Sequence, residues 1–134
     1  MRTADAAQEF LGCRRFAVTG VSREPANHGS NVVYTRLRER GYDVVAINPN
    51  AETVEGDRCY PTLADVPGEI DLLNVFRRSE DIPKHTDEIL SKKPKAVWFQ
   101  LGIRNDEVAE KLADAGIKVV QDLCLMVEHR ALVR

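Results

Sequence analysis

No run of apolar residues in this chain approaches the roughly 20 that would span a bilayer. The first twelve residues, MRTADAAQEFLG, also lack the long apolar stretch of a secretion signal. An excess of either charge is missing as well, since 19 Lys and Arg against 21 Asp and Glu leave a formal net charge of −2. Nucleic-acid binders are usually basic, with clustered Lys and Arg. We therefore expect a cytoplasmic protein that uses neither a membrane nor a nucleic acid as partner.

Cysteine is scarce, and its three copies, Cys13, Cys59 and Cys124, are scattered and odd in number. Reduced thiols fit this pattern better than a disulfide framework does. The three histidines are equally dispersed, so no metal-ligand spacing is present. We expect neither disulfides nor a metal site.

The length of 134 residues is close to the usual size of one domain, so residues 1–134 are expected to form a single unit. Apolar stretches alternate with segments of helical periodicity, which predicts an α/β fold. In one stretch, Val44 to Ile47, apolar residues are almost continuous, as in a strand covered on both faces. The expected strands are residues 16–19, 42–48, 70–76, 96–99 and 117–120, and the expected helices are 3–12, 30–40, 80–92, 105–115 and a last one capped by Asp122.

These elements predict a three-layer, doubly wound parallel sheet of Rossmann type with strand order 3-2-1-4-5. Residues 70–76 are the third strand in this order, and residues 51–68 are expected to be a connection with at most a one-turn helix at 62–65. Ligands of such sheets bind beyond the carboxyl ends of the strands, where the strand order reverses. The residues that follow each strand are therefore the candidates for a site.

The first of these strand ends carries the sequence TGVSREP. A turn between a strand and a helix aims backbone N–H groups at the start of the helix, where anions bind. Gly20 permits close approach of a ligand, and Pro25 stiffens the loop. Ser22 stands where the dinucleotide fingerprint GxGxxG has its second glycine, and it can contribute a hydroxyl while Arg23 contributes charge. We interpret the loop as a phosphate site; the alternative is a plain turn with a solvated arginine.

Two further strand ends add to this picture. Asn48 and Pro49 follow the second strand without an acidic residue before Glu52, which weighs against NAD because NAD-binding domains usually hold the ribose with Asp or Glu there. After the third strand, Phe76 can line a pocket, and Arg77 and Arg78 form a second corner that attracts anions; the alternative is a pair of solvated arginines.

Catalytic groups are not evident. Cys124 at the start of the last helix can be activated by the helix dipole, although a buried inert cysteine is the commoner outcome. Glu128 and His129 follow, but no nucleophile stands beside a base and a group that orients it.

Several motifs, TGVSREPANHGS, GYDVVAINPN, DLLNVFRRSEDIP and AVWFQLGIRNDEVAEKLADAGIKVVQDLCLMVEH, occur in this order. Over residues 16–129 the chain resembles the stand-alone CoA-binding domain family of small bacterial Rossmann proteins. It is also similar, at the level of one domain, to the N-terminal part of the succinyl-CoA synthetase alpha subunit. That subunit carries its catalytic histidine on a second domain, which this sequence does not include, so the ligase activity is not carried over.

The resemblance implies that the chain binds coenzyme A or an acyl-CoA. Implied ligand contacts are the phosphate loop, the nucleotide wall and the pantetheine path, namely Gly20, Val21, Ser22, Arg23 and Pro25, then Asn48, Pro49, Val75, Phe76 and Arg77, then Gln100 and Gly102. We expect a CoA-binding protein without its own catalytic set, which serves as an accessory, carrier or sensor. The alternative is an NAD(P)-binding Rossmann enzyme or redox sensor. A third hypothesis is a mixed disulfide between Cys124 and the CoA thiol; a homodimer or a CoA-dependent enzyme as partner stays open.

Overall fold

The computed structural model describes residues 13–21 and 29–127, so the helix expected at residues 3–12 lies outside the described part. Five parallel strands form the centre of the sheet: β1 (Arg15–Thr19), β2 (Asp43–Ile47), β5 (Leu72–Val75), β6 (Ala96–Phe99) and β7 (Lys118–Val120). A short hairpin, β3 (Thr53–Val54) and β4 (Asp57–Tyr60), extends the sheet beyond β2. The helices are α2 (Gly29–Glu39), α3 (Ile82–Lys92) and α4 (Asp106–Asp114), with single 3-10 turns at Leu63–Asp65 and Ser79–Asp81.

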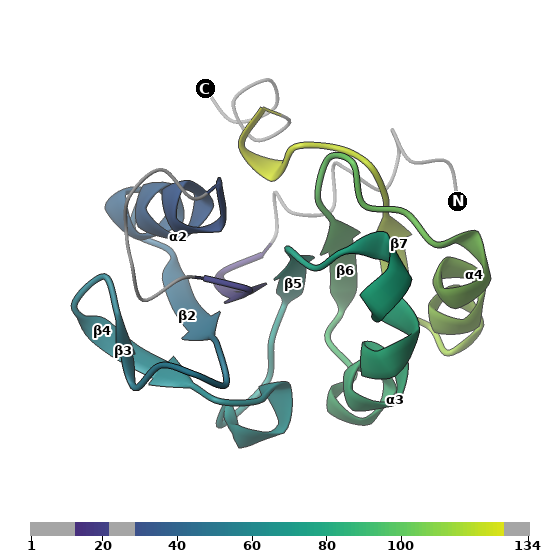
Figure 1. The fold of residues 1–134 in the computed structure, drawn as a ribbon, viewed down its shortest axis with the longest axis horizontal. Helices are drawn as coiled ribbons and strands as arrows, with labels where there is room; N and C mark the ends of the chain where they lie inside the picture. Colours follow the sequence, from purple (N-terminus) through teal and green to yellow (C-terminus); the bar gives the residue numbers. More distant parts are fainter. Residues whose placement is uncertain (1–12, 22–28, 128–134) are drawn as a thin grey trace.

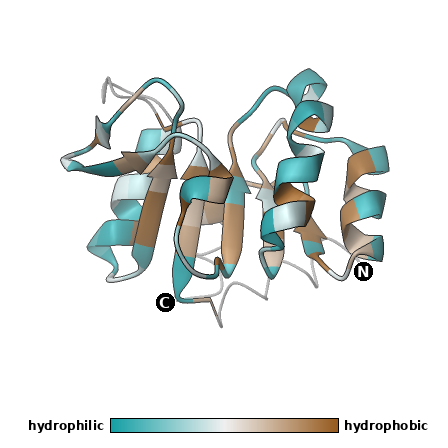
Figure 2. Cartoon of the chain, turned by 90° about the horizontal axis from the view of Figure 1, so that it is seen from below, coloured by the Kyte–Doolittle hydropathy of each residue, from teal (hydrophilic) through white to brown (hydrophobic). Residues whose placement is uncertain are grey.

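Helices cover both faces of this sheet, as the continuous apolar strands predict (Figure 1). One core cluster packs side chains of α2, such as Tyr34 and Leu37, and of the C-terminal turn at residues 125–126 against the sheet. The other cluster contains Ile82 and Ile89 of α3 and Leu112 of α4. Figure 2 shows the apolar strands between helices whose outer surfaces are hydrophilic. The three-layer, doubly wound α/β class is confirmed.

The strand order is β3-β4-β2-β1-β5-β6-β7. The expected order 3-2-1-4-5 was wrong for the five predicted strands, which lie in the order 2-1-3-4-5 when numbered along the chain, and the place next to β2 that was expected for the third strand is taken by β4. The placement of residues 70–76 as that third strand was wrong, because β5 pairs with β1, with Phe16 opposite Leu72. The prediction that residues 51–68 hold no strand was also wrong.

Strand β4 escaped the sequence pattern because only one of its four residues, Cys59, is buried. It is paired with β3 through the two-residue turn of Glu55 and Gly56, whose φ angles are 51° and 83°. Two consecutive positive φ angles are typical of the turns that close β-hairpins. The Glu-Gly pair was therefore the available signal for a hairpin.

Candidate functional site

The strand order reverses between β1 and β5. The chain leaves β1 toward α2 on one face of the sheet and leaves β5 toward α3 on the other face. Ligands of open α/β sheets bind at the carboxyl ends of two strands whose connections diverge in this way, and we call this position between β1 and β5 the crevice. The residues that follow β1, β2, β5 and β6 surround this position.

Gly20 and Phe76 meet at the centre of the crevice. The Gly20 N–H donates to Ile47 O at 3.1 Å, and the residue has a φ angle of 79°. A Cβ atom added to Gly20 would lie 2.4 Å from the carbonyl oxygen of Phe76. Side chains larger than hydrogen are excluded here by both the backbone conformation and the close approach of β5. The glycine therefore brings the β1 turn directly against the end of β5.

Helix α2 begins beside the same contact. Gly29, its first residue, faces the Phe76 ring, and the Ser30 hydroxyl donates to Gly20 O at 3.0 Å. No acidic residue lies in the first turn of α2. The positive end of the helix dipole is thus not offset by a carboxylate from its own first turn, and this end of the crevice favours an anion.

Both polar ends of the Asn48 side chain form hydrogen bonds within the protein. Its side-chain amide donates to Val21 O at 2.8 Å, and its Oδ1 accepts from the Asn50 N–H at 2.8 Å. The residue therefore fixes the β1 turn against the end of β2. Pro49 borders a hollow of about 550 Å³ between this loop and β4, lined by Asn50, Ala51, Glu52, Arg58, Cys59 and Pro61. Burial raises the pKa of the Cys59 thiol in its wall, so the thiol stays protonated at neutral pH.

The two arginines after β5 have different surroundings. Arg78 is exposed and forms ion pairs with Glu80 at 3.0 Å and Asp81 at 3.0 Å. Arg77 is half-buried, and no hydrogen bond or ion pair of its guanidinium is found within the described residues. Because its charge is not neutralised by a neighbouring carboxylate there, Arg77 is the better suited of the two to hold a phosphate.

The remaining candidates fall into three groups. Val75 is a core residue that packs on the side of α3 and α4, away from the α2 face. Gln100 is buried at the end of β6, and the Gly102 N–H donates to Asp122 Oδ1 at 2.7 Å. The last three candidates, Ser22, Arg23 and Pro25, lie outside the described residues.

Asp122 was expected to cap the last helix. It has a φ angle of 57° and does not begin the helical turn at residues 125–127, so this assignment was wrong.

Two polar residues of the buried strands were missed by sequence reasoning. Thr19 accepts the Phe76 N–H at 3.2 Å, and Asn74 of β5 is completely buried beside Trp98 and Gln100. The signal was available, because a polar side chain inside an apolar strand needs a hydrogen-bonding partner. Both residues lie at or just below the crevice.

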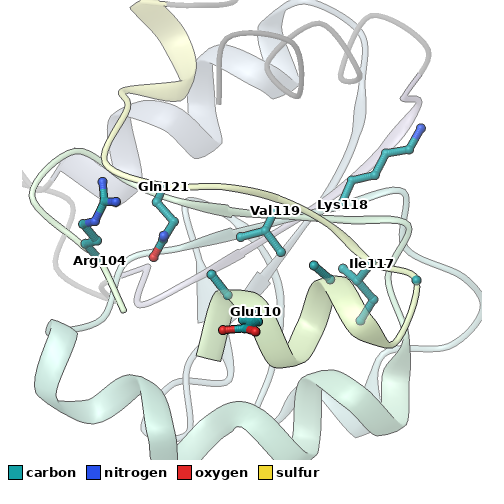
Figure 3. A pocket seen from close by; sticks show the side chains of 9 residues that line it. Arg104, Glu110, Ile117, Lys118, Val119 and Gln121 are labelled. Atoms are coloured by element: carbon teal, nitrogen blue, oxygen red, sulfur yellow. The ribbon is translucent and has the colours of Figure 1, made fainter. Parts of the chain in front are cut away.

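A second hollow, of about 530 Å³, lies between α4 and β7 (Figure 3). Arg104, Glu110, Lys118 and Gln121 surround it, and its other walls are formed by small and apolar residues. None of the candidate residues lines it. Within residues 13–21 and 29–127 there is no group of three His, Cys, Asp or Glu residues that could hold a metal ion. In the same ranges no helix has both the length and the apolar character needed to cross a bilayer.

The parts of this chain that match known proteins cover almost all of the described fold. A family described as CoA binding domain matches residues 14–130. The uncharacterized protein YneT of Bacillus subtilis is 34% identical over 116 residues, which cover 87% of this chain and 85% of that protein. A solved structure from Thermus thermophilus is 36% identical, superposes with a TM-score of 0.89, and matches 98% of this chain and 99% of its own. An ADP-forming acetate–CoA ligase of Archaeoglobus fulgidus is 31% identical over 108 residues, which are 78% of this chain and only 16% of the ligase.

Proposed function

This chain belongs to the family of CoA-binding domains, and on that premise we propose that it binds coenzyme A or an acyl-CoA in the crevice between β1 and β5. The observation that carries the proposal is the distribution of charge around the crevice. Helix α2 has no acid in its first turn, and Arg77 has no carboxylate partner among the described residues. Both features favour a ligand rich in phosphate, as CoA is, with a diphosphate and a 3′-phosphate.

Each part of the ligand has a proposed contact. The turn at Gly20 and Val21, continued by Ser22, Arg23 and Pro25, holds phosphates at the start of α2. Asn48 and Pro49 shape the wall of the nucleotide pocket, and Phe76 and Arg77 form the opposite wall, with Val75 supporting them from the core. Gln100 and Gly102 border the path of the pantetheine arm.

We also propose that the domain binds its ligand without catalysing a reaction on it and serves as an accessory, carrier or sensor. The support is that no nucleophile, base and orienting group converge in the described part of the crevice. The hydrogen bonds of Asn48, Thr19 and Gln100 are structural ones. The alternative ligand, NAD(P), is disfavoured because β2 is followed by Asn-Pro-Asn, without the acidic residue that usually holds the ribose.

Thermal unfolding in the presence of CoA, acetyl-CoA, 3′-dephospho-CoA, NAD and ATP tests this proposal. A ligand at about 100 times its Kd stabilises the native state by roughly 2.7 kcal/mol, which raises the melting temperature by several degrees. We expect a clear rise with CoA and a smaller one with the dephospho form. A rise with NAD but none with CoA would overturn the proposed ligand while leaving the fold assignment intact.

A further inference from the structure

Two amide side chains lie on the α2 face of the sheet, just below the crevice. Asn74 is completely buried in β5, and Gln100, directly after β6, is 8% exposed. Side chains alternate between the faces of a strand, so Asn74 shares the face of Leu72, and Gln100 shares that of Trp98. Leu72 and Trp98 both belong to the core cluster that packs against α2 and the C-terminal turn. The two amides are therefore neighbours on one face.

Backbone groups fix the orientation of both amides. The carbonyl of Trp98 can only accept, so Asn74 must direct Nδ2 toward it, at 3.2 Å. The N–H of Leu125 can only donate, so Gln100 must direct Oε1 toward it, at 3.3 Å. Asn74 Nδ2 also donates to Gln100 Oε1 at 3.2 Å, which agrees with both orientations. The assignment of oxygen and nitrogen in this pair thus follows from the network.

Each amide retains one unused group once these bonds are made. Asn74 Oδ1 is buried and has no hydrogen-bond partner among the described residues. Gln100 Nε2 makes no hydrogen bond within the same part of the chain. An unpaired carbonyl inside a protein is costly, and each such case in a native structure calls for an explanation. The pair therefore leaves one acceptor and one donor unpaired in the described residues, and the acceptor, Asn74 Oδ1, is buried.

The position of the pair connects it to the crevice. Asn74 lies two residues before Phe76, hence one layer below the contact between Phe76 and Gly20 on the same face of β5. Gln100 lies at the carboxyl edge, where its N–H donates to Val75 O at 3.3 Å. Gln100 is the more exposed member of the pair and lies nearer to the carboxyl ends of the strands.

We propose that Asn74 and Gln100 together bind a secondary amide of the pantetheine arm of CoA. Gln100 Nε2 donates to the carbonyl oxygen of that amide, and Asn74 Oδ1 accepts from its N–H. An amide supplies one donor and one acceptor, whereas a phosphate oxygen supplies only acceptors and leaves Asn74 Oδ1 unpaired. This inference rests on the proposed function and adds a residue, Asn74, that recognises the arm rather than the nucleotide.

Calorimetric titration with two ligands tests the proposal: CoA, and adenosine 3′,5′-bisphosphate, which lacks the arm. We expect Gln100→Met and Asn74→Leu each to weaken CoA binding about tenfold, as loss of one buried hydrogen bond does, and to leave the bisphosphate affinity within about twofold of the wild type. Gln121→Met is the matched control. The Gln121 amide accepts the Asn105 N–H at 2.7 Å beyond the end of β7, outside the crevice, so this variant should bind both ligands like the wild type.

The outcomes separate this inference from the proposed function. Equal loss of affinity for both ligands, or unchanged CoA affinity in Gln100→Met, would overturn the role of the amide pair while CoA binding itself stands. A wild-type protein that binds the bisphosphate as tightly as CoA would also contradict it. Should Asn74→Leu fail to fold, as checked by circular dichroism, Gln100→Met near the surface decides the question. If the wild type binds no CoA, the proposed function and this inference both fail.

Discussion

Polar groups are paired differently at the two ends of the parallel strands, which we call the amino edge and the carboxyl edge of the sheet. At the amino edge, Asp71 Oδ2 accepts from the N–H groups of Arg14 and Arg15 at 2.9 and 3.0 Å, and its Oδ1 pairs with Lys95 at 3.1 Å. The Arg15 guanidinium donates to the carbonyls of Pro67 and Glu69. At the carboxyl edge, Arg77 and Asn74 Oδ1 have no such partners among the described residues. Arg15 Nε is the exception at the amino edge, since it makes no hydrogen bond within the described part of the chain and only faces Asp43 at 3.3 Å. The amino edge thus mainly stabilises the fold, whereas the carboxyl edge has structural bonds, such as that of Asn48, beside groups that the described residues leave unpaired.

This contrast explains why the position where the strand order reverses, between β1 and β5, indicates the ligand site better than any single motif does. The carboxyl ends of parallel strands present the same backbone groups, so they differ through their side chains and through the helices that follow them. Only at the carboxyl edge does the start of α2 contribute a helix dipole beside Gly20. A ligand with several phosphates therefore has a physical reason to prefer that edge.

The largest effect is expected from closing the crevice at its centre. Gly20→Val places a β-branched side chain at a φ angle of 79°, with its Cβ overlapping the Phe76 carbonyl. Left-handed backbone and a backbone clash together should lower the free energy of unfolding by about 3 kcal/mol or more and abolish CoA binding. Urea denaturation and calorimetry measure the two losses.

Gly41→Ala separates the two causes, since Gly41 has a φ angle of 86° and no atom within 4 Å of the added Cβ. This control should cost only about 1 kcal/mol, the penalty of the backbone conformation alone. Similar losses in Gly20→Val and Gly41→Ala would show that β1 and β5 do not approach as closely as described.

The next effect concerns the amino edge. Burial by itself would raise the pKa of Asp71, but the N–H groups of Arg14 and Arg15 and the Lys95 ammonium together hold it below the ordinary value of 3.8. A carboxyl group with a lowered pKa stabilises the fold above its unfolded-state pKa, and this contribution is lost as pH falls through the folded-state pKa. Asp71→Asn should therefore cost about 2 kcal/mol at pH 7 and progressively less below pH 4. Urea titrations at several pH values measure it.

Asp43→Asn is the control for this edge, because its carboxylate is 67% exposed and pairs with Arg15 at 3.3 Å. An exposed ion pair contributes only about 0.5 kcal/mol, and Asp43→Asn should cost no more than that.

Asp71→Asn should leave the CoA affinity unchanged. A large loss of affinity in that variant would contradict the separation of roles between the two edges.

The smallest effect distinguishes the neighbouring arginines. Arg77→Gln should weaken CoA binding about three- to tenfold and reduce its dependence on salt, since one charged contact to phosphate is lost. Arg78→Gln should change the affinity by less than twofold, because Arg78 already pairs with Glu80 and Asp81. Titrations at two salt concentrations measure both, and equal effects would mean that the described surroundings do not decide which arginine binds.

The sequence was sufficient for the parts of the fold in which local pattern and burial agree. Continuous apolarity at β2 predicted a strand covered on both faces, and the adjacent residues Ala46 and Ile47, whose side chains point to opposite faces, are both buried. The helix expected from residue 105 forms as α4, and the Asn105 side chain caps it by accepting the Val108 N–H at 3.0 Å. These features depend on short-range preferences that operate in any context.

What the sequence did not reveal depends on pairing between distant segments. The residues of strand β4 are mostly polar, so apart from the Glu55-Gly56 turn before it the strand is recognised by its pairing with β2, with Ala46 opposite Cys59. Of the site, the contact of Gly20 with Phe76 joins residues 56 positions apart, and no local pattern announces it. The asymmetry of Arg77 and Arg78 likewise arises from the 3-10 turn that brings Glu80 and Asp81 to Arg78 alone.

The central claim is that CoA binds at the carboxyl edge and leaves the amino edge untouched. Titration of the 15N-labelled protein with CoA, followed by two-dimensional NMR, tests it residue by residue. We expect the backbone amide signals of Gly20, Phe76 and Gln100 to shift in a saturable manner while those of Arg15 and Asp71 stay in place. Shifts confined to the amino edge, or to the hollow between α4 and β7, would contradict the account.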